Sequence, residues 1–364
     1  MNLPPIRCSG FLCRPSVKRT FAAFVLLAFS TVIMSQPTDY GISLTGGRVI
    51  PVNGSRYEAF TPTFGVSADL YWQKNDQRYW TQYWHHPFFG LHAGFAFLQG
   101  DLVGNRLEVG GLVQAPIAYG FSWNFNVGFS FYTKPYSRTL NEENIFIGSY
   151  LNVLISAGFL YEIPRRDGTT FSIGGHVVHS SNGYTQKPNR GLNFIQLELG
   201  CRLPTGHQQP EPDTILSHFD YKPTFRPYLS ISPSFVMSRN DPIDVHKYYF
   251  AYTLQGGLIS HFHPCFSFGV NADMMYNYAH RKLANDHEAP VYWGLSAFGE
   301  SHWGPITLRM GAGHYLDYYW QNWEQWYLRM GVYYSLGNRQ RLGVAMKVHY
   351  DHIDYIEWTY MIEI

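Results

Sequence analysis

His179 and Ser181 are the residues whose type and spacing best suit chemistry, because they stand two positions apart in a segment of alternating character. Over residues 171–182 apolar and polar side chains alternate, which predicts a β-strand. His179 and Ser181 then share one face, about 7 Å apart along the strand, so their side chains can approach a hydrogen bond. A serine beside a histidine is the minimal nucleophile and base pair for acyl transfer.

The face that carries this pair is otherwise apolar, and we expect it to meet lipid. Asn193, on the strand expected to return, shares its face with Ile195 and Leu197, so it can reach His179 across the hairpin and hold its ring. A polar band at a barrel rim is the simpler interpretation of an isolated His and Ser. Polar groups that face lipid are costly, however, and need a functional reason.

The composition indicates the scaffold that positions these residues. Of 364 residues, 15% are charged and 18% are aromatic, whereas an ordinary soluble domain has roughly 25% charged residues. This argues against a cytoplasmic globular enzyme. Beyond the first 36 residues, no apolar run approaches the roughly 20 residues of a membrane-spanning helix, which excludes a polytopic helical membrane protein.

Period-two alternation recurs along the chain. In residues 121–131 one face is wholly apolar, and Gly, Ser and Asn dominate the other. The same pattern returns in residues 266–277, 306–312 and 342–351. A small, polar face with isolated charges is typical of a barrel lumen, and an aromatic face is typical of contact with lipid. We therefore expect an all-β protein, a transmembrane antiparallel β-barrel.

Turn signals divide the chain into two units. Residues 36–205 hold about eight expected strands, of which the sixth covers roughly 146–162 and the seventh carries His179. A polar stretch at residues 206–222 is the expected linker, and residues 223–364 hold about eight more strands without the catalytic motif. This predicts an eight-stranded N-terminal barrel followed by a second barrel-like unit, and one larger barrel of about 16 strands is the alternative.

Residues 1–35 have the parts of a signal peptide, since a basic segment without acids is followed by an apolar stretch and then by small or polar residues. Without their four basic residues the chain keeps 23 basic and 26 acidic residues, which gives no electrostatic footprint for nucleic acid. An exported barrel belongs in the outer membrane of a Gram-negative-type bacterium. A barrel entered from the periplasm sends odd strands outward, so the seventh strand ends near the outer leaflet, where lipid A resides.

The region around the pair resembles a known family. The motif consists of His179-Ser-Ser181-Asn182-Gly183, followed by Lys187-Pro188-Asn189-Arg190-Gly191-Leu192-Asn193-Phe194. It is similar to the signature of the outer-membrane lipid A 3-O-deacylase (PagL), or acyloxyacyl hydrolase, family. The resemblance covers roughly residues 37–205. It implies an eight-stranded barrel that removes an ester-linked acyl chain from lipid A with a lipid-facing site and without a metal or other cofactor.

The resemblance also implies roles for individual residues. Ser181 would be the nucleophile and His179 the general base. Asn189 would help to bind the oxyanion with its side chain. A backbone amide near Asn182 or Gly183 would be the second donor. The family usually has a Glu twelve residues after the Ser, where Asn193 stands here. An amide can orient the imidazole, but it stabilises an imidazolium less than a carboxylate does.

Two other functions remain open. The outer-membrane phospholipase A family has a similar His-x-Ser-Asn-Gly motif, with an Asn twelve residues beyond the Ser. That family has an Arg after the Gly, where Tyr184 stands here, and binds calcium at a dimer interface. The remaining alternative is a non-catalytic outer-membrane barrel that serves transport or envelope structure. The acyl position that is cut and the oligomeric state do not follow from the sequence.

One further cluster bears on metal binding. His261, His263 and Cys265 alternate across an expected periplasmic turn. Without a fourth ligand, such a cluster is more often ordinary turn and lumen chemistry, so we expect no metal site there. Cys201 also falls at an expected periplasmic end, and whether it pairs with Cys265 stays open.

Overall fold

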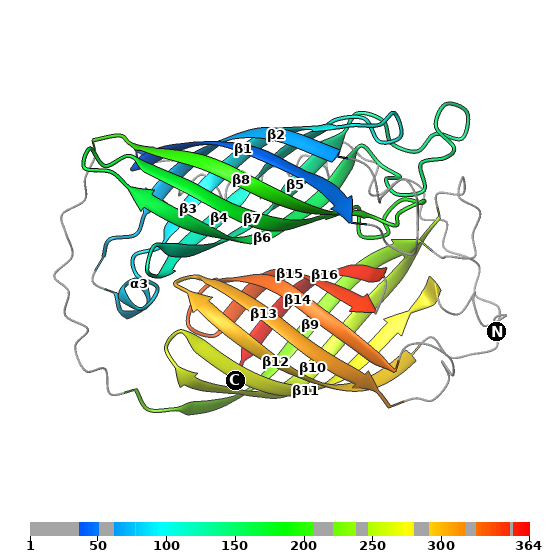
Figure 1. The fold of residues 1–364 in the computed structure, drawn as a ribbon. Coiled ribbons are helices and arrows are strands. Elements are labelled where there is room, and N and C mark those ends of the chain that lie inside the picture. The colour runs from blue at the N-terminus through cyan, green and yellow to red at the C-terminus, as the bar shows by residue number, and fades with distance from the viewer. Residues whose placement is uncertain are drawn as a thin grey trace.

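The computed structural model describes residues 36–50, 62–76, 78–206, 221–237, 247–279, 291–316, 325–349 and 352–364. These residues form sixteen strands and one short helix, and the strands close into two antiparallel barrels (Figure 1). The expected signal peptide, residues 1–35, and most of the expected linker lie outside the described residues. No described helix is long and apolar enough to span a membrane.

The first barrel closes by pairing its first strand with its eighth. Its strands are β1 (Asp39–Ile50), β2 (Pro62–Gln73), β3 (Phe88–Leu98), β4 (Arg106–Ala118), β5 (Phe121–Tyr132), β6 (Leu151–Pro164), β7 (Thr170–Ser181) and β8 (Leu192–Pro204). The short helix α3 (Tyr79–Tyr83) lies between β2 and β3. The prediction of an eight-stranded N-terminal barrel is therefore confirmed.

The second barrel closes by pairing β9 with β16. Its strands are β9 (Thr224–Met237), β10 (Tyr248–His263), β11 (Phe266–Asn277), β12 (Val291–Trp303), β13 (Ile306–Tyr315), β14 (Trp326–Ser335), β15 (Gln340–His349) and β16 (His352–Glu363). The prediction of a second barrel-like unit of about eight strands is also confirmed.

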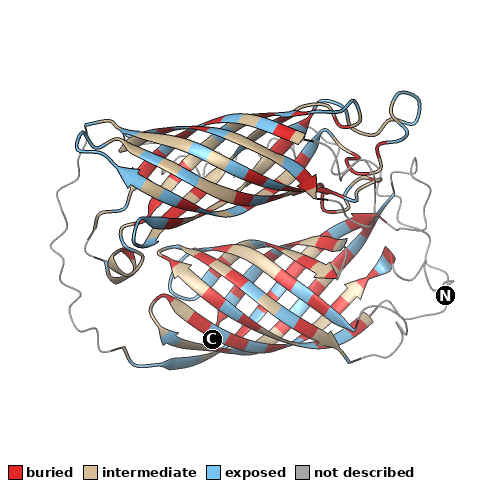
Figure 2. Ribbon diagram, viewed as in Figure 1, coloured by how far each residue is buried: buried red, intermediate tan, exposed pale blue. Residues whose placement is uncertain are grey.

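Alternation of side chains decides what each barrel face presents. On β5, Ser122, Asn124 and Asn126 are buried and face the lumen, whereas Phe121 and Phe131 are exposed on the outside. Figure 2 shows the same alternation of buried and exposed residues along the strands of both barrels. The outer faces are therefore apolar bands of the kind that contact lipid, and the inner faces are small and polar.

Strand β6 begins later than the sequence predicts. It starts at Leu151 rather than near residue 146. Phe146 and Ile147 are instead buried in the connection before the strand, where the side-chain oxygen of Asn144 accepts hydrogen bonds from both of their backbone N–H groups. Apolar loop residues that pack against inward-facing strand residues of the first barrel, such as Leu154, thus gave an alternation that imitates a strand.

Charged residues cross the interior of the second barrel. The guanidinium of Arg329 lies 2.7 Å from the carboxylate of Glu357 and 3.2 Å from that of Asp273, and all three side chains are buried. Lys347 lies 2.9 Å from Asp354 in the same interior. These ion pairs fill the lumen with paired charges, which favours a closed barrel over an open pore.

The two ends of the first barrel differ in the length of their connections. Short turns at residues 119–120 and 165–169 lie at one end, and longer connections at residues 133–150 and 182–191 lie at the other (Figure 1). Outer-membrane barrels have short periplasmic turns and longer extracellular loops. Because β7 ends at Ser181, this residue lies at the end with long connections.

Helix α3 joins the barrels at the end with short turns. Trp84, which follows the helix, stacks on Trp303 at the end of β12 with ring centroids 3.8 Å apart. The indole N–H of Trp84 also donates to the backbone oxygen of His302, at 3.0 Å. The two barrels are therefore in direct contact and not merely connected through the chain.

Candidate active site

Strands β7 and β8 bring three polar side chains together on the outer face of the first barrel. In their ladder His179 lies directly opposite Asn193. Nδ1 of His179 is 2.7 Å from Oδ1 of Asn193, and Nε2 is 3.0 Å from Oγ of Ser181. The three residues that the sequence singles out as a triad thus form one continuous chain of hydrogen bonds.

The partners of the His179 ring decide where its proton lies. The amide oxygen of Asn193 can only accept a hydrogen bond, so Nδ1 of His179 carries the proton and donates it. Nε2 is then left with its lone pair directed at Ser181, whose hydroxyl donates to it. This is the arrangement in which a histidine can remove a proton from a serine.

The site opens onto an apolar outer surface but is itself sheltered. Ser181 is only 3% exposed, although it belongs to the outer face of β7. Its neighbours on that face and on the outer face of β8 are much more open, with Val177 54% and Leu197 71% exposed. Ser181 therefore lies at the end of an open apolar strip on the outer face of these two strands.

The connection after β7 is fixed by Asn182. Its side-chain Nδ2 donates to Oγ of Ser149 at 3.0 Å and to the backbone oxygen of Gln186 at 2.8 Å. Its backbone N–H donates to Oδ1 of Asn189, also at 3.0 Å. This last bond joins two of the residues expected at the oxyanion site and leaves Nδ2 as the donor end of the Asn189 side chain.

Gly191 lies directly against the pair. A Cβ at this position would be 3.1 Å from Cε1 of His179 and 3.1 Å from Cβ of Ser181. Its backbone is also left-handed, with φ of +71°, a conformation that side chains disfavour. A glycine is therefore needed here for two reasons, and Gly183, with φ of +61°, has a similar backbone on the other side of the connection.

Two family comparisons divide the chain in the same way as the barrels. Residues 62–202 match the lipid A 3-O-deacylase (PagL) family, and residues 226–364 match the C-terminal domain of acyloxyacyl hydrolase. Each barrel thus matches a model of the PagL family. The first of these segments carries His179, Ser181 and Asn193. Comparison with curated proteins gives no match.

Several solved structures are also similar. The crystal structure of the outer membrane enzyme PagL is 18% identical, over 45% of this chain and 99% of that one, with a TM-score of 0.34. A de novo designed transmembrane β-barrel is 15% identical, over 46% and 98% of the two chains, with a TM-score of 0.27. A mutant Rh. blastica porin is 9% identical, over 90% and 99%, with a TM-score of 0.21.

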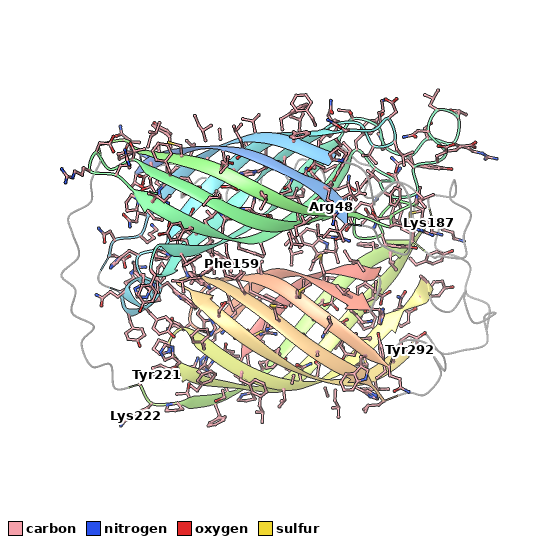
Figure 3. All side chains as sticks on the ribbon, viewed as in Figure 1. Arg48, Phe159, Lys187, Tyr221, Lys222 and Tyr292 are labelled. Atoms are coloured by element: carbon pink, nitrogen blue, oxygen red, sulfur yellow. The ribbon has the colours of Figure 1, made fainter. Side chains whose placement is uncertain are left out.

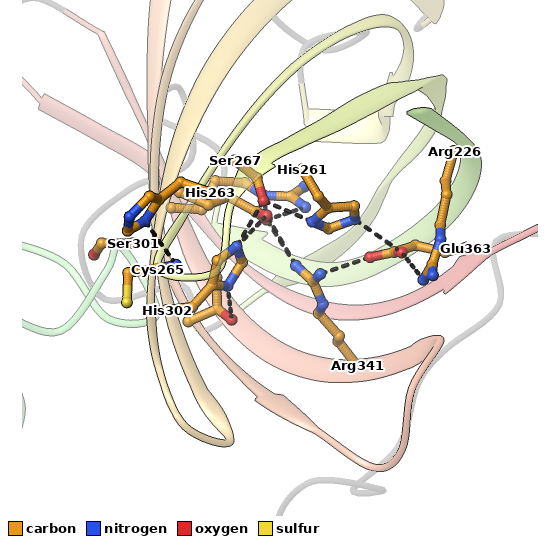
Figure 4. Close-up of polar contacts among 12 residues, drawn as sticks. Arg226, His261, His263, Cys265, Ser267, Ser301, His302, Arg341 and Glu363 are labelled. Atoms are coloured by element: carbon orange, nitrogen blue, oxygen red, sulfur yellow. Dashed lines mark hydrogen bonds and ion pairs between the residues drawn. The ribbon is translucent and has the colours of Figure 1, made fainter. Parts of the chain in front are cut away.

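His261, His263 and Cys265, the cluster in which we expect no metal site, have different partners (Figure 4). His261 turns inward, with Nδ1 2.7 Å from Oγ of Ser267 and Nε2 3.1 Å from Glu363. His263 instead accepts the backbone N–H of Cys265 at 3.1 Å. The three side chains therefore do not gather around one point, and Cys265 carries a free thiol, as does Cys201.

Ser267, His261 and Glu363 repeat the order of a serine, a histidine and an acid, but their setting is structural. Ser267 faces the interior of the second barrel, whereas Ser181 belongs to the outer face of the first, so an acyl chain in surrounding lipid does not reach Ser267. Its hydroxyl also lies 2.7 Å from Nε2 of His302, and Glu363 is paired with Arg341. These contacts tie together the barrel end at which they lie.

The lumen of the first barrel contains a small polar cavity. Its volume is about 50 Å³, enough for a few water molecules and too small for an acyl chain. The titratable residues that line it are Asp69, His92, Glu108, His176 and Glu198. His92 lies 2.7 Å from Asp69 and 3.2 Å from Glu108, so these groups pair with one another. The lumenal carboxylates are therefore a poorer candidate for lipid chemistry than the outer face of β7 and β8.

Sequence reasoning missed the groups that hold the loop after Ser181. Ser149 and Gln186 anchor Asn182, yet ordinary polar residues in loops give no signal of such a role. Gly191 follows Asn189 and Arg190 in the motif, and its place in a turn between two strands could have marked it as a required glycine. Ile356 of the second barrel contacts this loop as well, and nothing in its own surroundings in the sequence indicates it.

Proposed function

We propose that this protein removes an ester-linked acyl chain from lipid A, as a 3-O-deacylase, with Ser181 as the nucleophile. The observation that carries the proposal is the position of His179 between Asn193 and Ser181 on the outer face of the barrel. A hydrolase of soluble esters has no reason to place such a chain of hydrogen bonds on an apolar outer surface. The match of residues 62–202 to the lipid A 3-O-deacylase (PagL) family supports the same reaction.

Acyl transfer proceeds in two steps. Oγ of Ser181 attacks the ester carbonyl while Nε2 of His179 takes the hydroxyl proton. The tetrahedral intermediate then collapses, the sugar hydroxyl leaves with the proton from His179, and the acyl chain remains on Ser181. Water, activated by His179 in the same way, releases the fatty acid and restores the serine. Asn193 keeps the ring in the required tautomer throughout.

The negative charge that develops on the ester oxygen needs hydrogen-bond donors. The backbone N–H of Asn182 is already bonded to Asn189. We therefore assign the oxyanion site to Nδ2 of Asn189 and the backbone N–H of Gly183. The hydrogen bond from the backbone N–H of Asn182 fixes the orientation of the Asn189 side-chain amide, so its Nδ2 is available as an oxyanion donor.

The substrate is proposed to enter sideways from the outer leaflet. The triad stands at the barrel end with long connections, which is extracellular in outer-membrane barrels. The apolar outer residues of β7 and β8, among them Ile173, Val177, Ile195 and Leu197, offer a surface along which an acyl chain can lie without leaving the leaflet. The protein is accordingly assigned to the outer membrane of a Gram-negative bacterium.

Mass spectrometry of lipids tests the proposal. Lipid A and phospholipids are compared between cells that express the wild type, Ser181→Ala or Ser180→Ala. Ser180 is a matched control because it is the neighbouring serine but faces the lumen, where its hydroxyl lies 2.6 Å from that of Ser130. We expect loss of one acyl chain from lipid A with the wild type and Ser180→Ala, and unchanged lipid A with Ser181→Ala.

The same spectra distinguish the phospholipase alternative. If lysophospholipid forms in a calcium-dependent manner and lipid A stays intact, the protein is a phospholipase A and not a deacylase. Unchanged lipids in every strain, with the barrel folded in the membrane, would instead favour a non-catalytic barrel.

A further inference from the structure

The loop that follows Ser181 is held by the second barrel. Gly183 lies so close to Ile356, on the outer face of β16, that a Cβ at residue 183 would overlap this side chain. Tyr184 packs against a buried cluster of the second barrel, which consists of Val236, Tyr249, Ala251, Ala279 and Tyr355. The backbone oxygen of Tyr184 also accepts the N–H of Met237 at 3.4 Å. Two consecutive residues of the loop thus contact the other barrel.

These contacts occur where the strand pairing that closes the second barrel is incomplete. The described ladder between β9 and β16 covers only the four pairs from Tyr360↔Ile231 to Glu363↔Tyr228. Beyond it, side chains bridge the two strands, as in the bond from Oγ of Ser234 to the backbone oxygen of Ile356. Met237 ends β9, and its N–H bonds the first barrel's loop rather than β16. The loop therefore takes the place of a strand partner at this seam.

The backbone of the loop needs support of this kind. Gly183 and Tyr184 are both left-handed, with φ of +61° and +65°. For tyrosine this conformation is unfavourable, and such residues persist where surrounding contacts hold them. Part of the support comes from within the loop, where the backbone oxygen of Asn182 accepts the hydroxyl of Thr185 at 2.8 Å. The rest comes from the second barrel, through Ile356, Met237 and the cluster beneath Tyr184. Figure 3 labels Lys187 in the same loop, at the end of the first barrel that lies nearest to this seam.

We propose that the second barrel positions the active-site loop, with Tyr184 and Ile356 as positioning residues for acyl transfer at Ser181. This inference rests on the proposed function, because the backbone N–H of Gly183 is one of the two oxyanion donors assigned there. Neither side chain touches the reacting atoms. They act by fixing the peptide between Asn182 and Gly183, which a loose loop would present in varying directions. The second barrel thereby takes part in catalysis without a catalytic group of its own.

The test uses full-length protein in mixed micelles with purified lipid A. The variants Tyr184→Ala and Ile356→Ala remove the contact from either side. Ile362→Ala is the matched control, because Ile362 is also on the outer face of β16 but beside Leu229, away from the loop. Trp84→Ala is a second control, since it weakens the other contact between the barrels, at the opposite end. Heat-modifiable migration in gels verifies that each variant is folded.

We expect kcat to fall about tenfold or more for Tyr184→Ala and Ile356→Ala, with KM changed less than about twofold, because an oxyanion donor acts mainly in the transition state. The rate at which a fluorophosphonate labels Ser181 should fall in parallel. Ile356→Val should restore most of the activity, and both controls should behave like the wild type.

Three results would overturn the inference. If Tyr184→Ala and Ile356→Ala keep the wild-type kcat while Ser181→Ala is inactive, the two residues have no positioning role, and the proposed function stands. Equal losses in these variants and in both controls identify a general loss of stability instead. Activity that survives Ser181→Ala defeats the proposed function, and the inference falls with it.

Discussion

His179 and Asn193 face one another across the β7–β8 ladder, with Nδ1 of the ring 2.7 Å from Oδ1 of the amide. An uncharged amide therefore occupies the place from which a carboxylate could stabilise the imidazolium that forms when Ser181 loses its proton. The amide sets the tautomer as a carboxylate would, so the geometry of proton transfer is retained. What it lacks is charge, and this difference can be measured.

Asn193→Glu should raise kcat for lipid A deacylation by about tenfold, because a carboxylate stabilises the imidazolium in the transition state. Asn193→Gln is the control, since it has the same length as Glu and no charge. Steady-state kinetics in mixed micelles compares the two. Equal kcat in both variants would show that orientation alone matters at this position.

Gly191→Ala should reduce activity at least tenfold while the barrel stays folded. The added methyl would lie 3.1 Å from both His179 and Ser181, so these residues would have to shift by a few tenths of an ångström, which disturbs their hydrogen bond. Gly206→Ala is the matched control, because Gly206 has a similar φ of +79° and a Cβ added there would have no atom of the described residues within 4 Å. Both variants bear the strain of a left-handed alanine, and only the first crowds the site. Similar activity in the two variants would contradict the argument.

The two barrels can be predicted from the sequence because apolar and polar side chains alternate along each strand. The alternation over residues 121–131 predicts both the strand β5 and the direction in which its aromatic side chains point. The predicted start of β6 is wrong, because Phe146 and Ile147 lie in a loop and are buried in a cluster with inward-facing strand residues, and local alternation does not register such contacts. Local pattern thus reports burial but not the element that provides it.

In the candidate site too, contacts between neighbouring strands can be predicted from the sequence and contacts between the barrels cannot. His179 and Ser181 are neighbours in one strand, and Asn193 lies on the next, so strand geometry predicts their approach directly. The contact between Gly183 and Ile356 joins two separate barrels, and no period in either segment encodes it. Such contacts depend on how two closed surfaces dock, which a single sequence does not specify.

Cys265 should react slowly with iodoacetamide at pH 8 in the folded protein. It lies in the turn between β10 and β11 and is fully buried, and burial raises the pKa of its thiol to about 12. Because the thiolate is the nucleophile, a raised pKa keeps the group protonated and unreactive until the pH approaches this value. Peptide mass spectrometry over a pH series measures the labelling at this site, with urea-unfolded protein as the reference. Rapid labelling of folded protein at pH 8 would be inconsistent with this environment.

Arg329→Met should strongly destabilise the second barrel. It leaves the buried carboxylates of Asp273 and Glu357 without their common partner, and removal of one member of a buried ion pair costs about 3–5 kcal/mol. Arg339→Met provides the comparison, because Arg339 is exposed in the turn between β14 and β15. Thermal unfolding in detergent should show a lower Tm for the first variant only.

Since the second barrel is proposed to hold the loop after Ser181, deacylation by the Arg329→Met protein should decline over the same temperature range in which this barrel unfolds. An Arg329→Met protein whose activity persists after its second barrel has unfolded would separate stability from positioning and count against the latter.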